Sequence, residues 1–513
     1  MNGIILVILV PFFTAIGLAL LRNRPRLEKA LSLGSGVGLT AYVFWLLHYV
    51  DTHGIQVSMI AGYVAPYGIA FVADRLACIM LCLSMSVATV VLAYTCFTVS
   101  EIQQGHFFFP FFHVVLLGVN WSFITGDLFN LFVAYEVMLI GSYGSMMVGA
   151  TRQQVRQAMM YVAVNLVGGA LFVVGIALVY ALVGTLNMAD LAERTATLSG
   201  ARAAMLTAVS MVLLLVFALK AAAFPLFFWL PDSYPVVPPG VNGYFAGLLT
   251  KVGVYSLLRV FVMVFRQDGH ALATEILLVL SGFTMLLGVL GALCQWEMRR
   301  ILSWHIISQV GYMVMGIGLA ADPRIARTAV AATIFYVVHH IVVKSSLFLV
   351  AGVAEGVTGR TKLKEMGGVI TLAPAVAALF LIAALSLAGM PPFSGFLAKF
   401  VVLRAALDGQ RFGIVFVAVV TSFLTLLSMM KIWSYVFWGQ PRHAAAGAGW
   451  YGPAAATAVL VVATVALGVG AQPFMRLADD AADEIVTPTA YIRAVLGERP
   501  QALARGGDGA HNP

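Results

Sequence analysis

Two lysines lie deep inside apolar segments, where a charged side chain is costly. Lys220 and Lys251 each occupy the interior of an apolar run that is long enough to cross a bilayer. A lysine at the centre of a span costs about 2.5–3.5 kcal/mol on insertion scales, and such residues usually mark ion or proton pathways. These lysines are therefore the first candidates for proton transfer.

Pro225 interrupts the first of these runs close to Lys220. Because proline has no N–H to donate to the carbonyl of Ala221, the helix should open one residue after Lys220. Unwound backbone at membrane depth persists only against protein or a water-filled cavity. We therefore expect a hydrated lysine that exchanges protons. A simple kink with a structural lysine paired to a carboxylate is the alternative.

A second broken helix is predicted in LSLAGMPPFSGFLAKFVVLRA, late in the chain. Pro391 and Pro392 free the carbonyls of Leu387 and Ala388, and Lys399 follows about two turns later. Proline-interrupted spans at corresponding places in the two halves are typical of inverted-repeat transporters. Lys220 precedes its break whereas Lys399 follows its own, so the two lysines need not be geometric equivalents.

Glu136 is the only carboxylate near the centre of an apolar span, in NLFVAYEVMLIGSYGSMMVG. An uncompensated carboxylate at that depth would be neutral, whereas beside a lysine both groups could be charged. Lys220 is the candidate partner. Alternatively, Glu136 only accepts a hydrogen bond from a backbone donor.

A histidine pair and a lysine stand together in IFYVVHHIVVKSSLFLVAG. His340 and Lys344 are four residues apart, so they share one helix face and could pass a proton through one water. A metal site is the alternative, but adjacent histidines such as His339 and His340 diverge on a helix and no third ligand is evident. His305 fits either a core histidine or a relay member.

Other charged residues near the ends of the apolar runs have simpler interpretations. Arg259 and Lys431 can extend to the membrane interface, so structural roles are predicted for both. Asp74 and Arg75, at the start of another run, are also expected at the interface. Lys431 is therefore a useful comparison for the deeper lysines.

The composition identifies a polytopic membrane protein. Of 513 residues, 61% are hydrophobic and 10% charged, and the mean hydropathy is +0.95, values outside the range of soluble domains. The net charge of +8 comes mainly from residues at helix ends, so no nucleic-acid partner is expected. The four cysteines lie in apolar runs and are interpreted as core residues. The first 26 residues have no cleavage signature and predict a first spanning helix.

Windows of about 20 apolar residues predict fourteen spans. Their approximate limits are 2–22, 30–50, 70–99, 108–125, 128–149, 155–184, 203–230, 240–265, 271–293, 300–320, 326–354, 371–406, 412–438 and 453–472. An even count puts both termini on one side. More lysines and arginines follow odd-numbered spans than even-numbered ones, so the positive-inside rule places both termini outside a bacterial inner membrane.

Several stretches of the chain resemble a known family. They are LFNLFVAYEVMLIGSY, FPLFFWLPDSYPVVPPGVNGYFAGLLTKVGVYSLLR, RRILSWHIISQVGYM and GMPPFSGFLAKF. These runs resemble the antiporter-like subunits shared by respiratory complex I and Mrp cation/proton antiporters. YALVGTLNMADLAER, TPTAYIRAVLGE and the proline turn SYPVVPPG resemble the Mrp branch in particular.

The resemblance implies an all-α fold of fourteen helices with two inverted five-helix repeats, in which helices 7 and 12 are broken. The expected division is residues 1–107 for helices 1–3, 108–265 for repeat 1, 271–438 for repeat 2, and 439–513 for helix 14 and the tail. It also implies a central polar axis. The family's motif positions fall on the residues Glu136, Lys220, Lys251, His340, Lys344 and Lys399, with the breaks at Pro225, Pro391 and Pro392.

The expected function is proton translocation within a multisubunit Na⁺, Li⁺ or K⁺/proton antiporter. Partners would be the other subunits, H⁺, a monovalent cation and lipid, with no cofactor, resident metal or enzymatic site. One alternative is a proton-pumping subunit of complex I or a membrane hydrogenase. Another is a non-conducting scaffold subunit.

Overall fold

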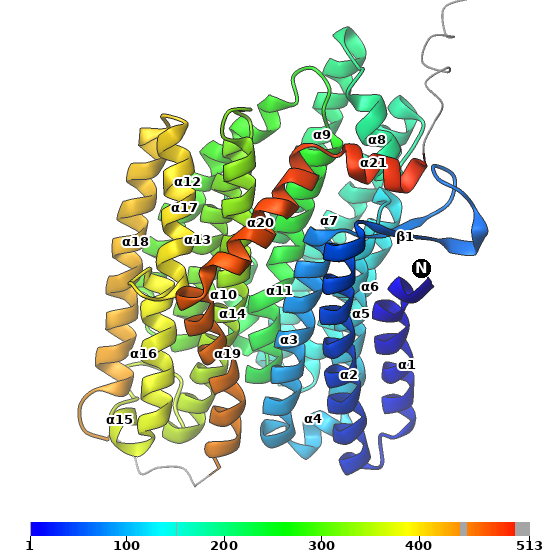
Figure 1. Ribbon diagram of the computed structural model, residues 1–513. Helices are drawn as coiled ribbons and strands as arrows, with labels where there is room; N and C mark the ends of the chain where they lie inside the picture. Colours follow the sequence, from blue (N-terminus) through cyan, green and yellow to red (C-terminus); the bar gives the residue numbers. More distant parts are fainter. Residues whose placement is uncertain (1, 150, 442–448, 498–513) are drawn as a thin grey trace, which may run out of the picture.

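The protein is a bundle of long helices that lie side by side (Figure 1). The computed structural model describes residues 2–149, 151–441 and 449–497. In these ranges, twelve helices are long and apolar enough to cross a membrane, and two shorter apolar helices, Phe108–Ile124 and Pro374–Ala388, complete fourteen crossings. The predicted number of spans is thus confirmed. Residues 498–513 of the predicted tail lie outside the described residues.

The elements fall into four consecutive groups. The first holds η1 (Asn2–Ile5), α1 (Leu6–Leu20), α2 (Pro25–His53), β1 (Gln56–Met59), η2 (Ile60–Gly62), β2 (Ala70–Ala73), α3 (Arg75–Thr98) and α4 (Glu101–Gly105). The second holds α5 (Phe108–Ile124), α6 (Leu128–Met147), α7 (Arg152–Val183), α8 (Met188–Thr195), α9 (Gly200–Ala221), α10 (Leu230–Ser233), η3 (Tyr234–Val236), α11 (Pro239–Leu258) and the π-helical η4 (Arg259–Val264).

The third group holds α12 (Ala271–Cys294), α13 (Met298–Leu319), α14 (Ala326–Thr358), α15 (Val369–Leu372), α16 (Pro374–Ala388), α17 (Ser394–Asp408), α18 (Phe412–Ile432) and the π-helical η5 (Trp433–Phe437). The last group holds α19 (Tyr451–Val469), α20 (Ala471–Val486) and α21 (Thr489–Leu496).

The second and third groups are two inverted repeats of five crossings each. α5 is the fourth crossing and α12 the ninth, so the two groups enter the bundle from opposite sides. Both break their fourth crossing, after α9 in one and between α16 and α17 in the other. Each also links its second crossing to a serine of its fifth. Tyr135 Oη lies 3.1 Å from Ser256 Oγ, and His305 Nε2 lies 2.9 Å from Ser428 Oγ. The predicted fold class is confirmed.

Polar residues at the helix ends fix where several crossings begin. The Asp74 side chain accepts a hydrogen bond from the N–H of Ala77 and starts α3. Asp127 does the same for α6, and a capping box of Thr151 and Gln154 starts α7. Such caps satisfy backbone donors that the first turn of a helix leaves unpaired.

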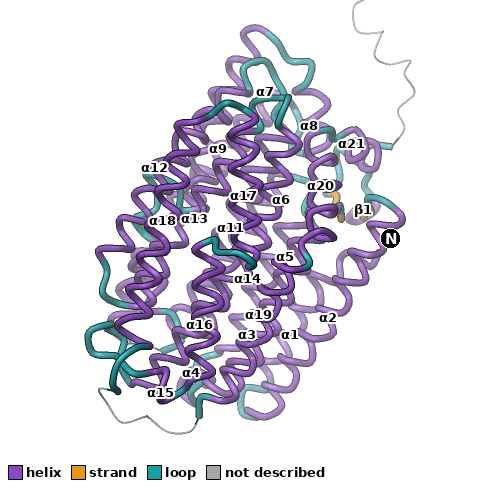
Figure 2. Tube along the Cα trace, turned by 60° about the vertical axis from the view of Figure 1, so that its left-hand side comes forward, coloured by secondary structure: helices purple, strands orange, loops and turns teal. Residues whose placement is uncertain are grey.

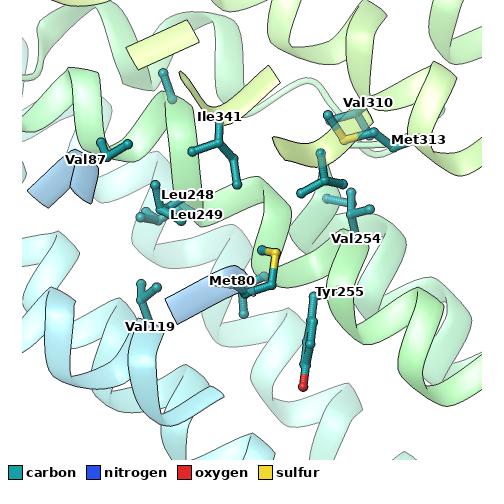
Figure 3. Close-up of a cluster of buried hydrophobic side chains, with 14 of the residues drawn as sticks. Met80, Val87, Val119, Leu248, Leu249, Val254, Tyr255, Val310, Met313 and Ile341 are labelled. Carbon is teal, nitrogen blue, oxygen red and sulfur yellow. The ribbon is translucent and has the colours of Figure 1, made fainter. Parts of the chain in front are cut away.

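The centre of the bundle is formed by α11, α13 and α14. Every residue in the most apolar stretch of α14 is buried, compared with 28% for α2 and α18 at the periphery. Figure 2 shows α11 and α14 running through the middle of the molecule. Their side chains pack with those of neighbouring helices in one apolar cluster, which includes Met80, Leu248, Val254, Met313 and Ile341 (Figure 3).

A β-hairpin replaces the start of one predicted span. Residues 70–99 were expected to form a single crossing, but β1 and β2 pair antiparallel with Met59 opposite Ala70, and helix α3 begins only at Arg75. The sequence AFVA is short and apolar, a pattern that periodicity cannot assign to helix or strand.

α20 lies obliquely across the bundle rather than through it (Figure 1, red). It packs against α14, α3 and η4, so it bridges elements of both repeats. Its buried face holds small residues, among them Ala478, Ala481 and Ala482. Two ion pairs attach it to the bundle, from Arg75 to Glu484 and from Arg327 to Asp483. We call α20 the strap.

Candidate functional site

Four lysines are buried inside the bundle, as the sequence predicts. Lys220, Lys251, Lys344 and Lys399 come from α9, α11, α14 and α17, and each is at most 5% exposed. Among the described residues, none of their ammonium groups lies within 4.0 Å of a carboxylate; the buried ion pairs there belong to arginines. The four lysines are held by neutral oxygens instead.

Lys220 is bound by an amide that the sequence analysis did not single out. Its Nζ donates a hydrogen bond to Asn165 Oδ1 on α7, at 2.9 Å, and lies 5.8 Å from the ring centroid of Tyr135. Glu136, the predicted partner, is half-buried on α6 and lies beyond ion-pair distance of Lys220. The two groups remain electrostatic neighbours.

The break in the seventh crossing follows Lys220 directly. α9 ends at Ala221, and Ala222 takes a left-handed conformation with φ of 58°. The indole of Trp229 folds back and donates a hydrogen bond to the carbonyl of Leu219, at 3.2 Å. On the other side, Gly253 of α11 packs so closely that a Cβ there would lie 2.5 Å from the backbone nitrogen of Ala221. The broken end is thus enclosed by protein.

Lys399 occupies the second break. Its Nζ donates to the carbonyls of Leu387 and Ala388, at 3.0 and 2.9 Å, and lies 3.0 Å from Ser422 Oγ. The two carbonyls are those that the prolines of the break were predicted to free. The ring centroid of Tyr312 lies 5.4 Å from the same nitrogen. The break therefore supplies a ready-made binding site for an ammonium group.

Lys251 sits on the middle helix α11, between the two breaks. Its Nζ donates to the carbonyl of Ala246 at 2.6 Å and lies 3.2 Å from Thr250 Oγ1. A cavity of about 10 Å³, with otherwise mostly apolar walls from α3, α11 and α14, adjoins the side chain. That volume is close to the minimum that holds one water molecule.

α14 contributes the predicted histidine and lysine. Lys344 Nζ donates to the carbonyl of Leu302 at 3.1 Å. Both ring nitrogens of His340 are buried and have no hydrogen-bond partner in the described part of the chain. His339 Nδ1 lies 2.8 Å from Ser394 Oγ, at the start of α17. Lys251, His340 and Lys344 are electrostatic neighbours of one another, so the structure brings this part of the predicted axis together.

The buried arginines have a different environment. Arg259 binds both carboxylate oxygens of Asp74, with Nη2 2.9 Å from Oδ1, and its guanidinium lies near the rings of Tyr255 and Tyr491. Arg259 and Asp74, both expected near a membrane interface, lie at the end of α11 and the start of α3 and are buried in protein as each other's counter-ions. Arg299 pairs with Glu355 at 2.9 Å. These pairs have the geometry of structural contacts.

The residues that sequence reasoning missed are neutral. Asn165, Tyr135, Tyr312 and Ser422 all contact a buried lysine. Asn165 could have been noticed as an amide in the apolar run MMYVAVNLVGGALF, but the carbonyl partners carry no sequence signal. In the described ranges, no group of three His, Cys, Asp or Glu side chains is arranged to hold a metal ion.

Fourteen crossings in inverted repeats, with a row of buried amines through the centre, define a membrane subunit of the antiporter-like class. Residues 125–425 match the family described as NADH:quinone oxidoreductase/Mrp antiporter, TM. With more than half of the chain matched, this protein belongs to that family.

Named relatives place it within the family. The chain is 43% identical, over 97% of its length and all of the relative's, to the D subunit of the Na⁺/H⁺ antiporter of Alkalihalophilus pseudofirmus. It is 34% identical, again over 97% of the chain and all of the relative, to the protein of the same name from Bacillus subtilis. The similarity is therefore to the D subunits of Mrp-type antiporters.

Two solved structures share the fold. A chain in the Mrp complex from a Dietzia species superposes with a TM-score of 0.89 at 33% identity, covering 96% of this chain and 99% of that one. A chain of an archaeal membrane-bound sulfane sulfur reductase superposes with a TM-score of 0.90 at 23% identity, covering 97% of this chain and all of that one. The second likeness concerns the fold alone.

Proposed function

We propose that this chain is the proton-translocating subunit of a multisubunit monovalent cation/proton antiporter in a bacterial inner membrane. The observation that carries the proposal is the contrast between the two kinds of buried cation. The buried Arg259 and the partly buried Arg299 have carboxylate partners, whereas the four buried lysines are bound only by neutral oxygens. A lysine can release its proton to water or a neighbour, and an arginine cannot.

The proposed path follows the buried groups in the order Lys220, Lys251, His340 with Lys344, and Lys399. Direct packing of Gly253 against Ala221 brings the helices of the first two lysines together. His305 is an electrostatic neighbour of both Lys344 and Lys399, which connects α14 to the second break. Buried polar atoms along this route, such as His340 Nε2 and Gln309 Nε2, have no protein partner among the described residues. Water molecules would satisfy them and carry protons between the amines.

Glu136 would set the charge at the start of this path and mark a contact with another subunit. It is half-buried on α6, in the middle of a span. Contact between lipid and the exposed part of this side chain would be costly at that depth, so a neighbouring subunit would cover it. A hard cation prefers several oxygen ligands, and a single central carboxylate supplies too few of them. The sodium path would therefore lie in, or be shared with, another subunit.

The orientation of the chain is part of the proposal. The ends of α1 and α7 near Arg22, Arg24 and Arg152 would face the cytoplasm, which puts both termini outside. An alkaline phosphatase fused after residue 497 should be active, and a fluorescent protein at the same point should be dark. The reverse result would invert the orientation.

Lysine-to-arginine variants test the relay directly. Lys220→Arg and Lys399→Arg keep a positive charge but remove a group that can give up its proton, so both should assemble and lose ΔpH-driven cation exchange in everted vesicles. Lys431→Arg is the matched control, because Lys431 lies partly exposed on α18 over Trp296. Subunit levels are checked by blotting.

The same experiment separates the relay from a scaffold. If the two central arginine variants kept most of their exchange while Lys220→Ala lost it, positive charge alone would suffice at these sites. A scaffold or purely electrostatic role would then replace proton transfer. Exchange by this chain alone in purified vesicles would instead move the cation path into it.

A further inference from the structure

The two charged groups at the start of the proposed path are flanked by one helix. α7 carries adjacent glycines, Gly168 and Gly169, at this level of the bundle. A Cβ on Gly169 would lie 2.7 Å from Glu136 Oε1, and a Cβ on Gly168 would lie 3.7 Å from Lys220 Nζ. The glycine backbone of α7 therefore lies close to both the carboxylate and the ammonium group, and a side chain at Gly169 would collide with the carboxylate.

Asn165, one turn earlier on α7, is the polar side chain that binds the ammonium group. It is 3% exposed. Its Nδ2 donates a hydrogen bond to the carbonyl of Tyr161 at 2.8 Å, and its Oδ1 accepts from Lys220 at 2.9 Å. The first bond fixes the orientation of the second, because a flipped amide would turn its NH₂ group toward the ammonium and its oxygen toward a carbonyl.

Glu136 lacks the corresponding contact. Its Oε1 is buried without a hydrogen-bond partner in the described part of the chain. Lys220 is the cation that acts electrostatically on this carboxylate. A side chain of four methylene groups can reorient between an amide and a carboxylate without movement of the backbone. The structure thus offers Lys220 two acceptors and shows it on the neutral one.

We infer that Asn165 is a positioning residue that holds the Lys220 ammonium away from Glu136 and so defines a second state of the lysine. This inference rests on the proposed relay. In the state shown, the lysine has no ionic partner and can pass its proton on. When it turns to Glu136, the ion pair favours the protonated form. Asn165 therefore controls how often Lys220 is free to release a proton.

Two variants of the assembled antiporter test the inference. Asn165→Ala removes the neutral acceptor. Exchange should then fall about tenfold, the change expected when a hydrogen bond to a charged group is lost. Asn165→Asp puts a carboxylate in place of the amide, and the pH optimum of exchange should move upward by about one pH unit or more. Asn120→Ala is the matched control: Asn120 is fully buried in α5 and bound to Ser84, far in sequence from the lysine sites.

A double variant shows whether the two acceptors share one ammonium group. If they do, the effects of Asn165→Ala and Glu136→Gln on exchange should be non-additive. Additive effects, an unchanged pH profile in Asn165→Asp, or an equal loss in Asn120→Ala would each overturn the inference. Failure of the relay itself would look different, because Lys220→Arg would then exchange normally. A normal Asn165 series with an inactive Lys220→Arg would remove only the role of Asn165.

Discussion

Single residues in this bundle differ in whether their charge is neutralised at short range. Arg259 is fixed by Asp74 and lies against two tyrosine rings, so its charge is permanent and its position is defined. Lys399, by contrast, is held by two carbonyls and a hydroxyl. Removing one partner of a buried ion pair leaves an uncompensated charge, whereas a lysine held by dipoles can become neutral and stay in place.

A charge deletion at Glu136 follows from this difference. Glu136→Gln keeps the shape of the side chain but removes the anion that acts on Lys220. Exchange in everted vesicles should fall at least about tenfold while the complex still assembles. Glu275→Gln is the control, since Glu275 is exposed and pairs with Arg411 at the surface. Normal exchange in Glu136→Gln would take the carboxylate out of the mechanism.

The charged members of the site could be predicted because charge is rare in an apolar span. Lys220, Lys251 and Lys344 are conspicuous for that reason. The groups that bind them could not be predicted in the same way. The carbonyl of Leu302 comes from α13, distant in sequence from Lys344, and every residue has a carbonyl. Only the packing of helices decides which carbonyl accepts a hydrogen bond from the ammonium group.

At the scale of elements, the two breaks are stabilised by close helix contacts. The end of α9 lies against Gly253 of α11, and the start of α17 lies against the end of α16. Proline patterns predicted where the helices stop, but the packing that holds the ends needed the structure. The β-hairpin was missed for a related reason, because its short apolar strand looks the same as the beginning of a helix.

Gly253 offers a test of the first break. An alanine there would place its Cβ 2.5 Å from the nitrogen of Ala221, and backbone cannot yield as a flexible side chain does. Gly253→Ala should destabilise the fold by about 1–3 kcal/mol and lower the thermal midpoint of the purified complex. Gly38→Ala on α2 meets nothing within 4 Å and should leave the midpoint unchanged or slightly higher. Equal midpoints for the two variants would show that the break tolerates expansion.

At the scale of the whole molecule, the strap connects the two repeats. Glu484 lies in α20, which is outside the candidate membrane spans. Burial and the nearby charge of Asp74 raise the pKa of Glu484 to about 7, and Arg75 only partly opposes this. Between the ordinary glutamate pKa of 4.5 and about 7, the folded state binds more protons than the unfolded state. The contribution of Glu484 to stability is therefore greatest below this window and falls as the pH rises through it.

Hydrogen exchange can detect this pH dependence. After correction for intrinsic rates, amides of residues 471–486 should exchange faster at pH 8 than at pH 5.5, because ionised Glu484 weakens the attachment of the strap. Glu484→Gln should remove most of the difference. Asp483→Asn, which alters the exposed pair with Arg327, should keep it. Equal protection at the two pH values in the parent protein would show that Glu484 does not titrate in this range.

The pair between Arg75 and Glu484 joins positions 409 residues apart. A ribosome adds about 5–20 residues per second, so α3 waits for tens of seconds in the membrane before its partner on the strap is synthesised. During that time the other crossings can insert and pack without being tied together. The last contact forms only when nearly the whole polypeptide exists, and a chain that stops early therefore leaves Arg75, at the start of α3, without Glu484.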